Sequence, residues 1–201
     1  VMLGDDVGLM VRAFAATLGD KNVLVQRAVL ELLVVSFPLK VKNVGEIIQQ
    51  DDFVLLMKSV ASVVLRKDMS LNRRLYAWLL GPDEHIEQQI KHFHDYGKNA
   101  LVSALKGLFF TQYYNLVTAQ RPYKILISLM DKEEIGQPLV QDLLIDVLWS
   151  LKDNIEKAPF GTELLQTANM FLEMIDPYLI WMKLYELVQN RFSLNNGFDT
   201  A

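Results

Sequence analysis

The sequence contains no cysteine among its 201 residues, so it can form neither a disulfide nor a thiolate metal site. It also lacks an uninterrupted apolar run of 18 residues. The richest segment, residues 23–39, carries Gln26, Arg27 and Glu31 and is not expected to span a membrane. The glycine-rich phosphate and dinucleotide motifs and the nucleophile elbow are absent, so we predict no enzyme active site and no cofactor. The opening Val1–Gly4 does not resemble a signal peptide, and we expect a segment of a longer protein.

Positive charge is also scarce. The formal net charge is −4, and basic residues do not interleave with aromatic residues along one face, so no nucleic-acid partner is expected. The three histidines, His85, His92 and His94, lie in a polar stretch over residues 83–95. Histidines that bind one metal from a helix normally stand four residues apart, whereas His92 and His94 are two apart. The pattern therefore favours an exposed polar loop without a metal.

What the chain has in abundance is apolar residues, at 51%, and they recur at helical spacing. This spacing predicts eight or nine helices with short turns, and a strand over residues 32–37 is the less favoured alternative. Asn22 and Ser70 are the expected N-caps, and Gly81 followed by Pro82 should end a helix. The predicted helices cover residues 5–18, 23–37, 51–66, 71–80 and 96–117, and further helices begin at Pro122, Pro138, about Leu164, and Pro177.

Several predictions concern which side chains face inward. In the first helix we expect Leu9, Ala13, Ala16 and Leu18 to face the core. The second helix is apolar on more than one face, which indicates burial between neighbouring helices. The clearest pattern follows Pro138, where two adjacent rows are apolar: Leu139, Leu143, Val147 and Leu151, and Val140, Leu144 and Leu148.

A weak repeat underlies these helices. Arg27, Arg74 and Arg121 are each 47 residues apart, and Asp20 and Asp68 precede the first two in the intervening turns. An aspartate in the turn followed by an arginine in the second helix is similar to a HEAT repeat. We therefore predict an all-α fold, a right-handed α-solenoid of HEAT/armadillo-like helical pairs. One such segment is expected over residues 1–194, with a turn or disordered tail over 195–201.

The candidate binding site is a basic turn formed by Arg66, Lys67, Arg73 and Arg74. In one interpretation these cations are structural, with Asp68 accepting from Arg74 and Asp20 from Arg27. In the other they contact a phosphorylated lipid headgroup or an acidic partner segment. The neighbouring Tyr76 and Trp78 could anchor a partner, but helical spacing favours the core for Trp78.

The stretch from Arg66 to Gly81, RKDMSLNRRLYAWLLG, resembles the N-terminal conserved region of the Dopey family. Other matching stretches follow in the family's order, so that the resemblance extends from about Asp5 to Val188. The connector between Gly81 and Tyr96 is shorter than in the animal pattern. The other matching stretches are Val23–Arg27 with Phe37–Pro38, Pro122–Lys132, Thr167–Asn169, and Asp176–Tyr178 with Trp181.

This resemblance implies a large non-enzymatic cytoplasmic protein, peripheral on Golgi and endosomal membranes. It implies work in membrane traffic as a scaffold or adaptor. The implied partners are a large HEAT-repeat scaffold related to Arf exchange factors, a type IV P-type ATPase flippase, and kinesin light chain. It also implies binding to phosphatidylinositol 4-phosphate, an anionic Golgi lipid, for which the basic turn is the candidate site. The family supplies no catalytic residue to transfer.

Overall fold

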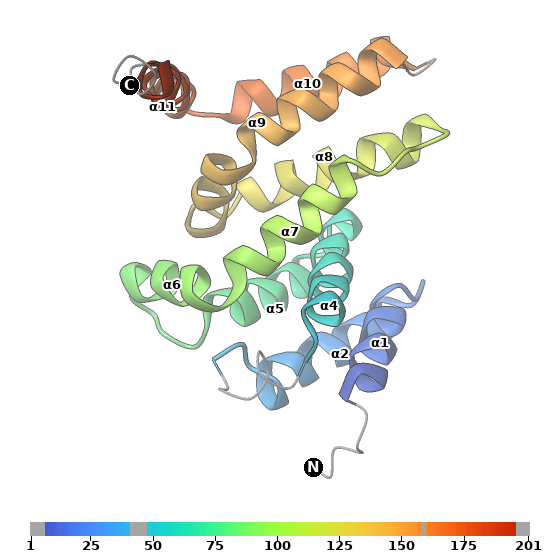
Figure 1. Cartoon of the computed structure of the whole chain (residues 1–201). Helices are drawn as coiled ribbons and strands as arrows, with labels where there is room; N and C mark the ends of the chain where they lie inside the picture. The colour runs from blue at the N-terminus through green and yellow to red at the C-terminus, as the bar shows by residue number, and fades with distance from the viewer. Residues whose placement is uncertain (1–6, 41–47, 158–159, 196–201) are drawn as a thin grey trace.

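A computed structural model describes residues 7–40, 48–157 and 160–195, and these residues form helices and short connections without a strand (Figure 1). The predicted all-α fold is therefore confirmed, and residues 32–37 belong to a helix or its end rather than to a strand. The predicted tail, residues 195–201, lies outside the described residues except for Asn195, which ends the last helix. The α-helices are α1 Val7–Leu18, α2 Val23–Ser36, α4 Gln50–Ser62, α5 Met69–Leu80, α6 Ile86–His92, α7 Lys98–Phe109, α8 Leu116–Met130, α9 Glu133–Lys157, α10 Gly161–Met174 and α11 Pro177–Asn195.

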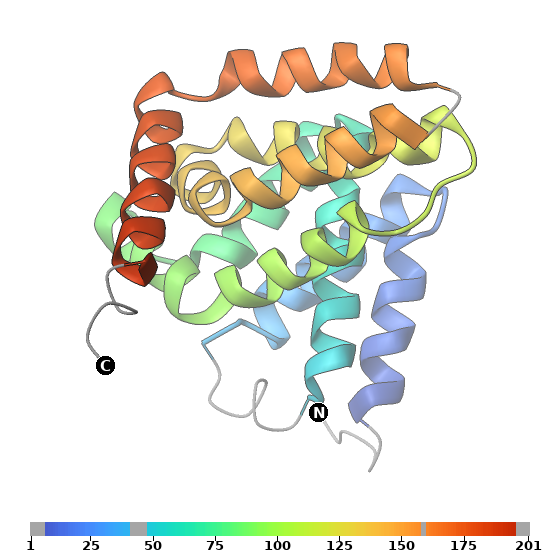
Figure 2. The same ribbon diagram turned by 45° about the horizontal axis from the view of Figure 1, so that its top comes forward.

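The helices stack in two layers, as expected for an α-solenoid. In one layer α1 packs on α4, α4 on α7, and α7 on α9; in the other α2 packs on α5, and α8 on α10 (Figures 1 and 2). The 47-residue spacing places Arg27, Arg74 and Arg121 on α2, α5 and α8, three helices of the second layer. A short 3₁₀ helix, Val63–Arg66, extends α4, and a π-helical turn, Phe93–Gly97, joins α6 to α7.

One continuous apolar core runs along the interface of the two layers. It continues around α9, where both predicted apolar rows are buried except for Leu148. Because these rows cover more than one face, α9 can pack against α7, α8 and α10 together. The fully buried members of the first row are Leu139, Leu143 and Val147.

A buried polar cluster ties three of these helices together. The Tyr123 hydroxyl lies 2.7 Å from Ser150 Oγ, which in turn donates to the carbonyl oxygen of Phe109 at 2.7 Å. Asn154 Nδ2 donates to the Tyr123 oxygen at 3.2 Å and to the Ser150 carbonyl oxygen at 2.8 Å. With Tyr123 as donor to Ser150, every hydroxyl here has a partner, so the cluster can be buried without an unmet hydrogen bond.

Two predicted helix starts at proline are wrong. α8 begins at Leu116, because the Asn115 side chain accepts from the backbone N–H of Thr118 at 3.0 Å and caps the helix there. Pro122 therefore lies inside α8, and Pro138 lies inside α9, which begins at the acidic pair Glu133–Glu134. Each proline removes one helical hydrogen bond, and packing of the flanking apolar residues compensates for it.

The stretch around residues 83–117 also differs from prediction. In place of the expected polar loop with the histidines, the structure has α6 and the π-helical turn. The large apolar residues Ile86, Ile90 and Phe93 recur there at helical spacing. The expected long helix over 96–117 is two helices, because α7 ends at Phe109 and α8 has its own cap. The connection between them, residues 110–115, carries two exposed aromatic side chains, Phe110 and Tyr114.

The inward face predicted for the first helix is largely wrong. Leu18 is buried as expected, but Leu9, Ala13 and Ala16 are exposed, and the core is contacted by Val11 and Ala15 instead. On α2, Leu24, Leu32 and Val35 are likewise exposed, so this helix is not enclosed by neighbours. Within the described residues, α1 and α2 have a neighbouring pair on one side only, and this leaves their outer faces uncovered.

Candidate docking surfaces

The basic turn joins the 3₁₀ helix to α5. Lys67 adopts a left-handed backbone conformation, with φ of 53°, and so reverses the chain between the two helices. The N-cap is Asp68 rather than the predicted Ser70, because Asp68 Oδ1 accepts from the backbone N–H of Leu71 at 3.0 Å. An aspartate with an extended backbone just before the first turn accepts a hydrogen bond from a free N–H of the helix. Its negative charge also interacts favourably with the positive end of the helix dipole.

Arg74 is held inside the repeat. Its Nε donates to Glu31 Oε2 at 2.6 Å, across to α2, and its Nη1 donates to the Ser70 carbonyl oxygen at 3.1 Å. The predicted partner, Asp68, is occupied as a cap, and Asp20 accepts from the N–H of Asn22 rather than from Arg27. The predicted pairs of Asp68 with Arg74 and of Asp20 with Arg27 are therefore wrong. Arg74 is nevertheless a structural residue, as that interpretation predicted.

The other three cations face solvent. Arg66 is exposed, with one Nη2 bond of 2.7 Å to the Asp20 carbonyl oxygen, while Lys67 and Arg73 are exposed without an ion pair in the described part of the chain. Met69 lies between them in sequence and is 87% exposed, an unusual position for a large apolar side chain. The turn thus presents three cations beside one unprotected apolar side chain.

The aromatic residues of α5 have structural roles. Trp78 is buried and its indole N–H donates to the Phe37 carbonyl oxygen at 2.8 Å. The Tyr76 hydroxyl donates to the Ser128 carbonyl oxygen at 3.3 Å, and burial, followed by the nearby Asp131 carboxylate, raises the pKa of Tyr76. Neither side chain is available as an anchor for a partner.

A second surface, which the sequence did not indicate, is formed by α11. Leu179 and Ile180, in its first turn, pack against the core, and its described contacts with the fold are mainly with α9. Beyond these two, large apolar side chains point outward on most sides of the helix, with Trp181 70% exposed. The other exposed members are Tyr178, Met182, Leu184, Tyr185, Leu187 and Val188.

Of the three histidines, His92 packs within the fold, whereas His85 and His94 are exposed. His92 Nδ1 lies 3.1 Å from the Leu79 carbonyl oxygen, and its ring covers Gly81, which adopts a φ of 77°. Among the described residues, no three side chains of the metal-binding types gather at one point. The described helices also include none with both the length and the apolar character needed to cross a membrane.

Two protein-family models match the chain. A model described as "Dopey, N-terminal" matches residues 1–84, and a model described as "DOP1 middle TPR domain" matches residues 92–198. The first match ends in the connection between α5 and α6, the second begins at His92, the last residue of α6, and neither model describes an enzyme family. The second match agrees with the stacked helical pairs, since TPR repeats are helix–turn–helix units. No solved structure matches the chain.

Curated relatives from animals and fungi agree. Protein DOP1B of Xenopus laevis is 37% identical over 171 residues, which cover 73% of this chain and 8% of that protein. Protein dop1 of Emericella nidulans is 33% identical over 90% of this chain, and Protein DOP1 of Saccharomyces cerevisiae 30% identical over 91%. The chain spans only 11% and 12% of these two fungal proteins. On the family models and these identities, the chain belongs to the Dopey (DOP1) family.

Proposed function

We propose that this chain is a non-enzymatic docking segment of a scaffold in Golgi–endosome membrane traffic. Its partners in this proposal are proteins of a flippase-associated complex, namely a large HEAT-repeat scaffold related to Arf exchange factors and a type IV P-type ATPase. Kinesin light chain is a further proposed partner. The proposed location is the cytoplasmic face of Golgi and endosomal membranes. Family membership supports the scaffold role, and the exposed apolar side chains of α11 support the contact with a partner.

The observation that supports docking is the uncovered apolar face of α11. Seven large apolar side chains on this one helix are between 42% and 70% exposed. Together they present on the order of 700 Å², close to the area that each side of a standard protein–protein interface buries. Trp181, Tyr178 and Tyr185 are also the residue types that contribute most to binding at such interfaces.

The test is a pull-down with purified members of the proposed complex. Replacing Trp181 and Tyr185 together by aspartate should weaken capture by at least about tenfold, because charge cannot be buried in an apolar interface without a partner. Ile86→Asp is the matched control, since Ile86 is an equally exposed apolar residue on α6. The proposal fails if the intact chain captures none of these proteins, or if the control and the α11 variant weaken capture equally.

A second candidate function is binding of phosphatidylinositol 4-phosphate by the basic turn. The observation that favours it is the exposure of Met69 between Arg66, Lys67 and Arg73. Cations near an anionic membrane each contribute about 1 kcal/mol, and an exposed methionine can enter the headgroup region beside them. Arg74 is not part of this site, because it is paired with Glu31.

Vesicle flotation separates this candidate from docking alone. The triple substitution of Arg66, Lys67 and Arg73 by glutamate should abolish flotation with vesicles that contain phosphatidylinositol 4-phosphate, and Met69→Ser should weaken it. Arg74→Gln should leave flotation unchanged while lowering the free energy of unfolding. Equal flotation of the triple variant and the wild type would refute lipid binding at this turn.

A further inference from the structure

The start of α5 places a serine among the cations of the basic turn. Ser70 lies in the first turn of α5 and is partly exposed, and its Oγ accepts a hydrogen bond from Arg74 Nη1 at 3.2 Å. It is the only serine of the sequence with two basic residues within four positions on each side, namely Arg66 and Lys67 before it and Arg73 and Arg74 after it. A negative group on this hydroxyl would form charge-assisted hydrogen bonds.

A second guanidinium lies on the other side of the same serine. Helices α2 and α5 lie side by side and run in the same direction, since Arg66 bonds to the turn before α2 and Arg74 bonds to Glu31 further along. Arg27 stands one helical turn before Glu31, and Ser70 stands one turn before Arg74. Residues four apart share one side of a helix, so Arg27 and Ser70 lie on the facing sides of α2 and α5.

The Arg27 side chain lacks an acceptor. Its Nε atom is buried and has no hydrogen-bond partner in the described part of the chain, whereas Nε of Arg74 donates to Glu31 at 2.6 Å. The carboxylates of Asp20 and Asp68 accept from backbone N–H groups of their own turns. A buried donor without an acceptor costs free energy, and an anion between α2 and α5 would remove that cost.

We propose that Ser70 is a phosphorylation site whose phosphoryl group binds between Arg74 and Arg27. The reaction transfers the γ-phosphoryl group of ATP to Ser70 Oγ: the bond to ADP breaks, the new P–O bond forms, and the hydroxyl proton passes to the base of the kinase. A phosphoserine carries a charge of about −1.5 to −2 at pH 7 and three acceptor oxygens, and it adds hydrogen bonds at a helix N-terminus beside arginines. The basic residues on both sides favour a kinase with an acidic substrate cleft.

The charge balance of this region gives the modification a second effect. Over residues 20–31 and 66–74 six cations face three carboxylates, so the unmodified surface is positive: Lys21, Arg27, Arg66, Lys67, Arg73 and Arg74, against Asp20, Glu31 and Asp68. A phosphate removes most of this excess. Phosphorylation therefore releases the chain from anionic membranes, and this second effect, though not the site itself, rests on the proposed lipid binding.

The first experiment tests whether the site accommodates a phosphate. Phosphoserine is incorporated at position 70 during translation, and the melting temperature is compared with that of the unmodified chain. It should rise by about 3 °C or more, because the phosphate gains charge-assisted hydrogen bonds. In the Arg27→Met background the same modification should raise it by less than half as much. Phosphoserine at position 103, an exposed serine on α7, is the matched control and should give no rise. No rise at position 70, or an equal rise with and without Arg27, would overturn the proposal.

The second experiment tests whether a kinase reaches the serine. The chain is incubated with ATP and purified protein kinase C, which prefers serines with basic residues on both sides, and the product is mapped by mass spectrometry. The phosphate should lie on Ser70 and be lost in Ser70→Ala, because the first turn of a helix opens more readily than its middle. A chain that stays unmodified, or is modified only at other serines, would contradict the assignment.

Vesicle flotation tests the regulation. With phosphatidylcholine vesicles that contain phosphatidylinositol 4-phosphate, phosphoserine at position 70 should lower the membrane affinity by at least about tenfold, and phosphoserine at position 103 should leave it unchanged. Equal flotation with and without the phosphate at position 70 would refute the regulation. If the unmodified chain does not float, the lipid function is wrong, and the melting and kinase experiments still decide whether Ser70 is a phosphorylation site.

Discussion

Helices α5 and α11 each carry a tryptophan on an apolar face, yet the two faces have opposite surroundings. Trp78 on α5 is 2% exposed and hydrogen-bonded to Phe37, whereas Trp181 on α11 is 70% exposed. The difference arises from position in the stack: α5 packs against α2 and the 3₁₀ helix, and the described part of α11 meets mainly α9. Similar residues thus stabilise the fold in one region and are exposed in the other, within the described part of the chain.

Alanine at the two tryptophans should show the largest difference. Trp78→Ala is expected to lower the free energy of unfolding by about 3–5 kcal/mol, because it leaves a cavity and an unpaired carbonyl at Phe37. Trp181→Ala is expected to change it by less than about 0.5 kcal/mol. Urea unfolding followed by circular dichroism measures both. A loss of unfolding free energy above 2 kcal/mol for Trp181→Ala would contradict this contrast, because it would mean that the Trp181 side chain is packed within the fold.

Removing one hydroxyl from each region should give a smaller contrast. Tyr123→Phe is expected to cost about 1–2 kcal/mol, because the hydroxyl is buried between Ser150 and Asn154. Tyr185→Phe on α11 should be nearly neutral, since its exposed hydroxyl can exchange its Gln189 partner for water. The same unfolding titration tests this pair, and equal losses would contradict it.

The buried cluster also predicts a dependence on alkaline pH. Burial is the main cause that raises the pKa of Tyr123, and its hydrogen bonds with Ser150 and Asn154 oppose this only in part. The unfolded chain therefore ionises this tyrosine at a lower pH than the folded chain does. Its contribution to stability is complete below about pH 10 and is lost as the pH rises further. Tyr123→Phe should flatten the fall of the unfolding free energy with pH, and parallel curves for variant and wild type would refute this assignment.

The sequence predicted those features that depend on local periodicity. The two apolar rows of α9 and the cap at Asn22 follow from spacing within a dozen residues, and both are confirmed apart from the exposed Leu148. Periodicity shows which residues share a face, but not whether a neighbour covers that face. For this reason the buried Trp78 was predicted, whereas the exposure of Leu9 and of most of α11 was not.

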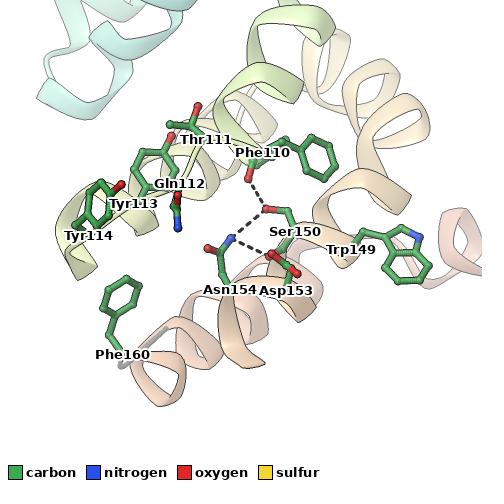
Figure 3. A pocket seen from close by; sticks show the side chains of 11 residues that line it. Phe110, Thr111, Gln112, Tyr113, Tyr114, Trp149, Ser150, Asp153, Asn154 and Phe160 are labelled. Carbon is green, nitrogen blue, oxygen red and sulfur yellow. Dashed lines mark hydrogen bonds between the residues drawn. The ribbon is translucent and has the colours of Figure 1, made fainter. Parts of the chain in front are cut away.

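For a similar reason, the sequence did not predict contacts between side chains that are far apart in the chain. Glu31 and Arg74 are 43 residues apart and meet only because α2 and α5 stack in one layer. A groove between α9 and the connection after α7 likewise combines residues 109–114 with residues 149–154 and Phe160 (Figure 3), and the polar cluster beneath it depends on Tyr123 from a third helix. The family motif identified the protein family, and the sequence already favoured a structural role for Arg74. The arrangement of helices was needed to identify its partner, Glu31, and to show that Arg66, Lys67 and Arg73 are exposed.

The smallest expected effect on stability comes from making α11 polar. The double substitution of Trp181 and Tyr185 by serine should leave the unfolding free energy within about 0.5 kcal/mol of the wild type, because both side chains already face water. It should, however, lower the fluorescence of a bound hydrophobic dye such as ANS, since exposed apolar patches are the surfaces that such dyes and partner proteins occupy. Leu143→Ser on α9 is the matched change in the packed region, and it should instead destabilise the chain and raise dye binding. If the α11 variant behaves as the α9 variant does, α11 is packed as closely as α9, and the contrast between the two regions is wrong.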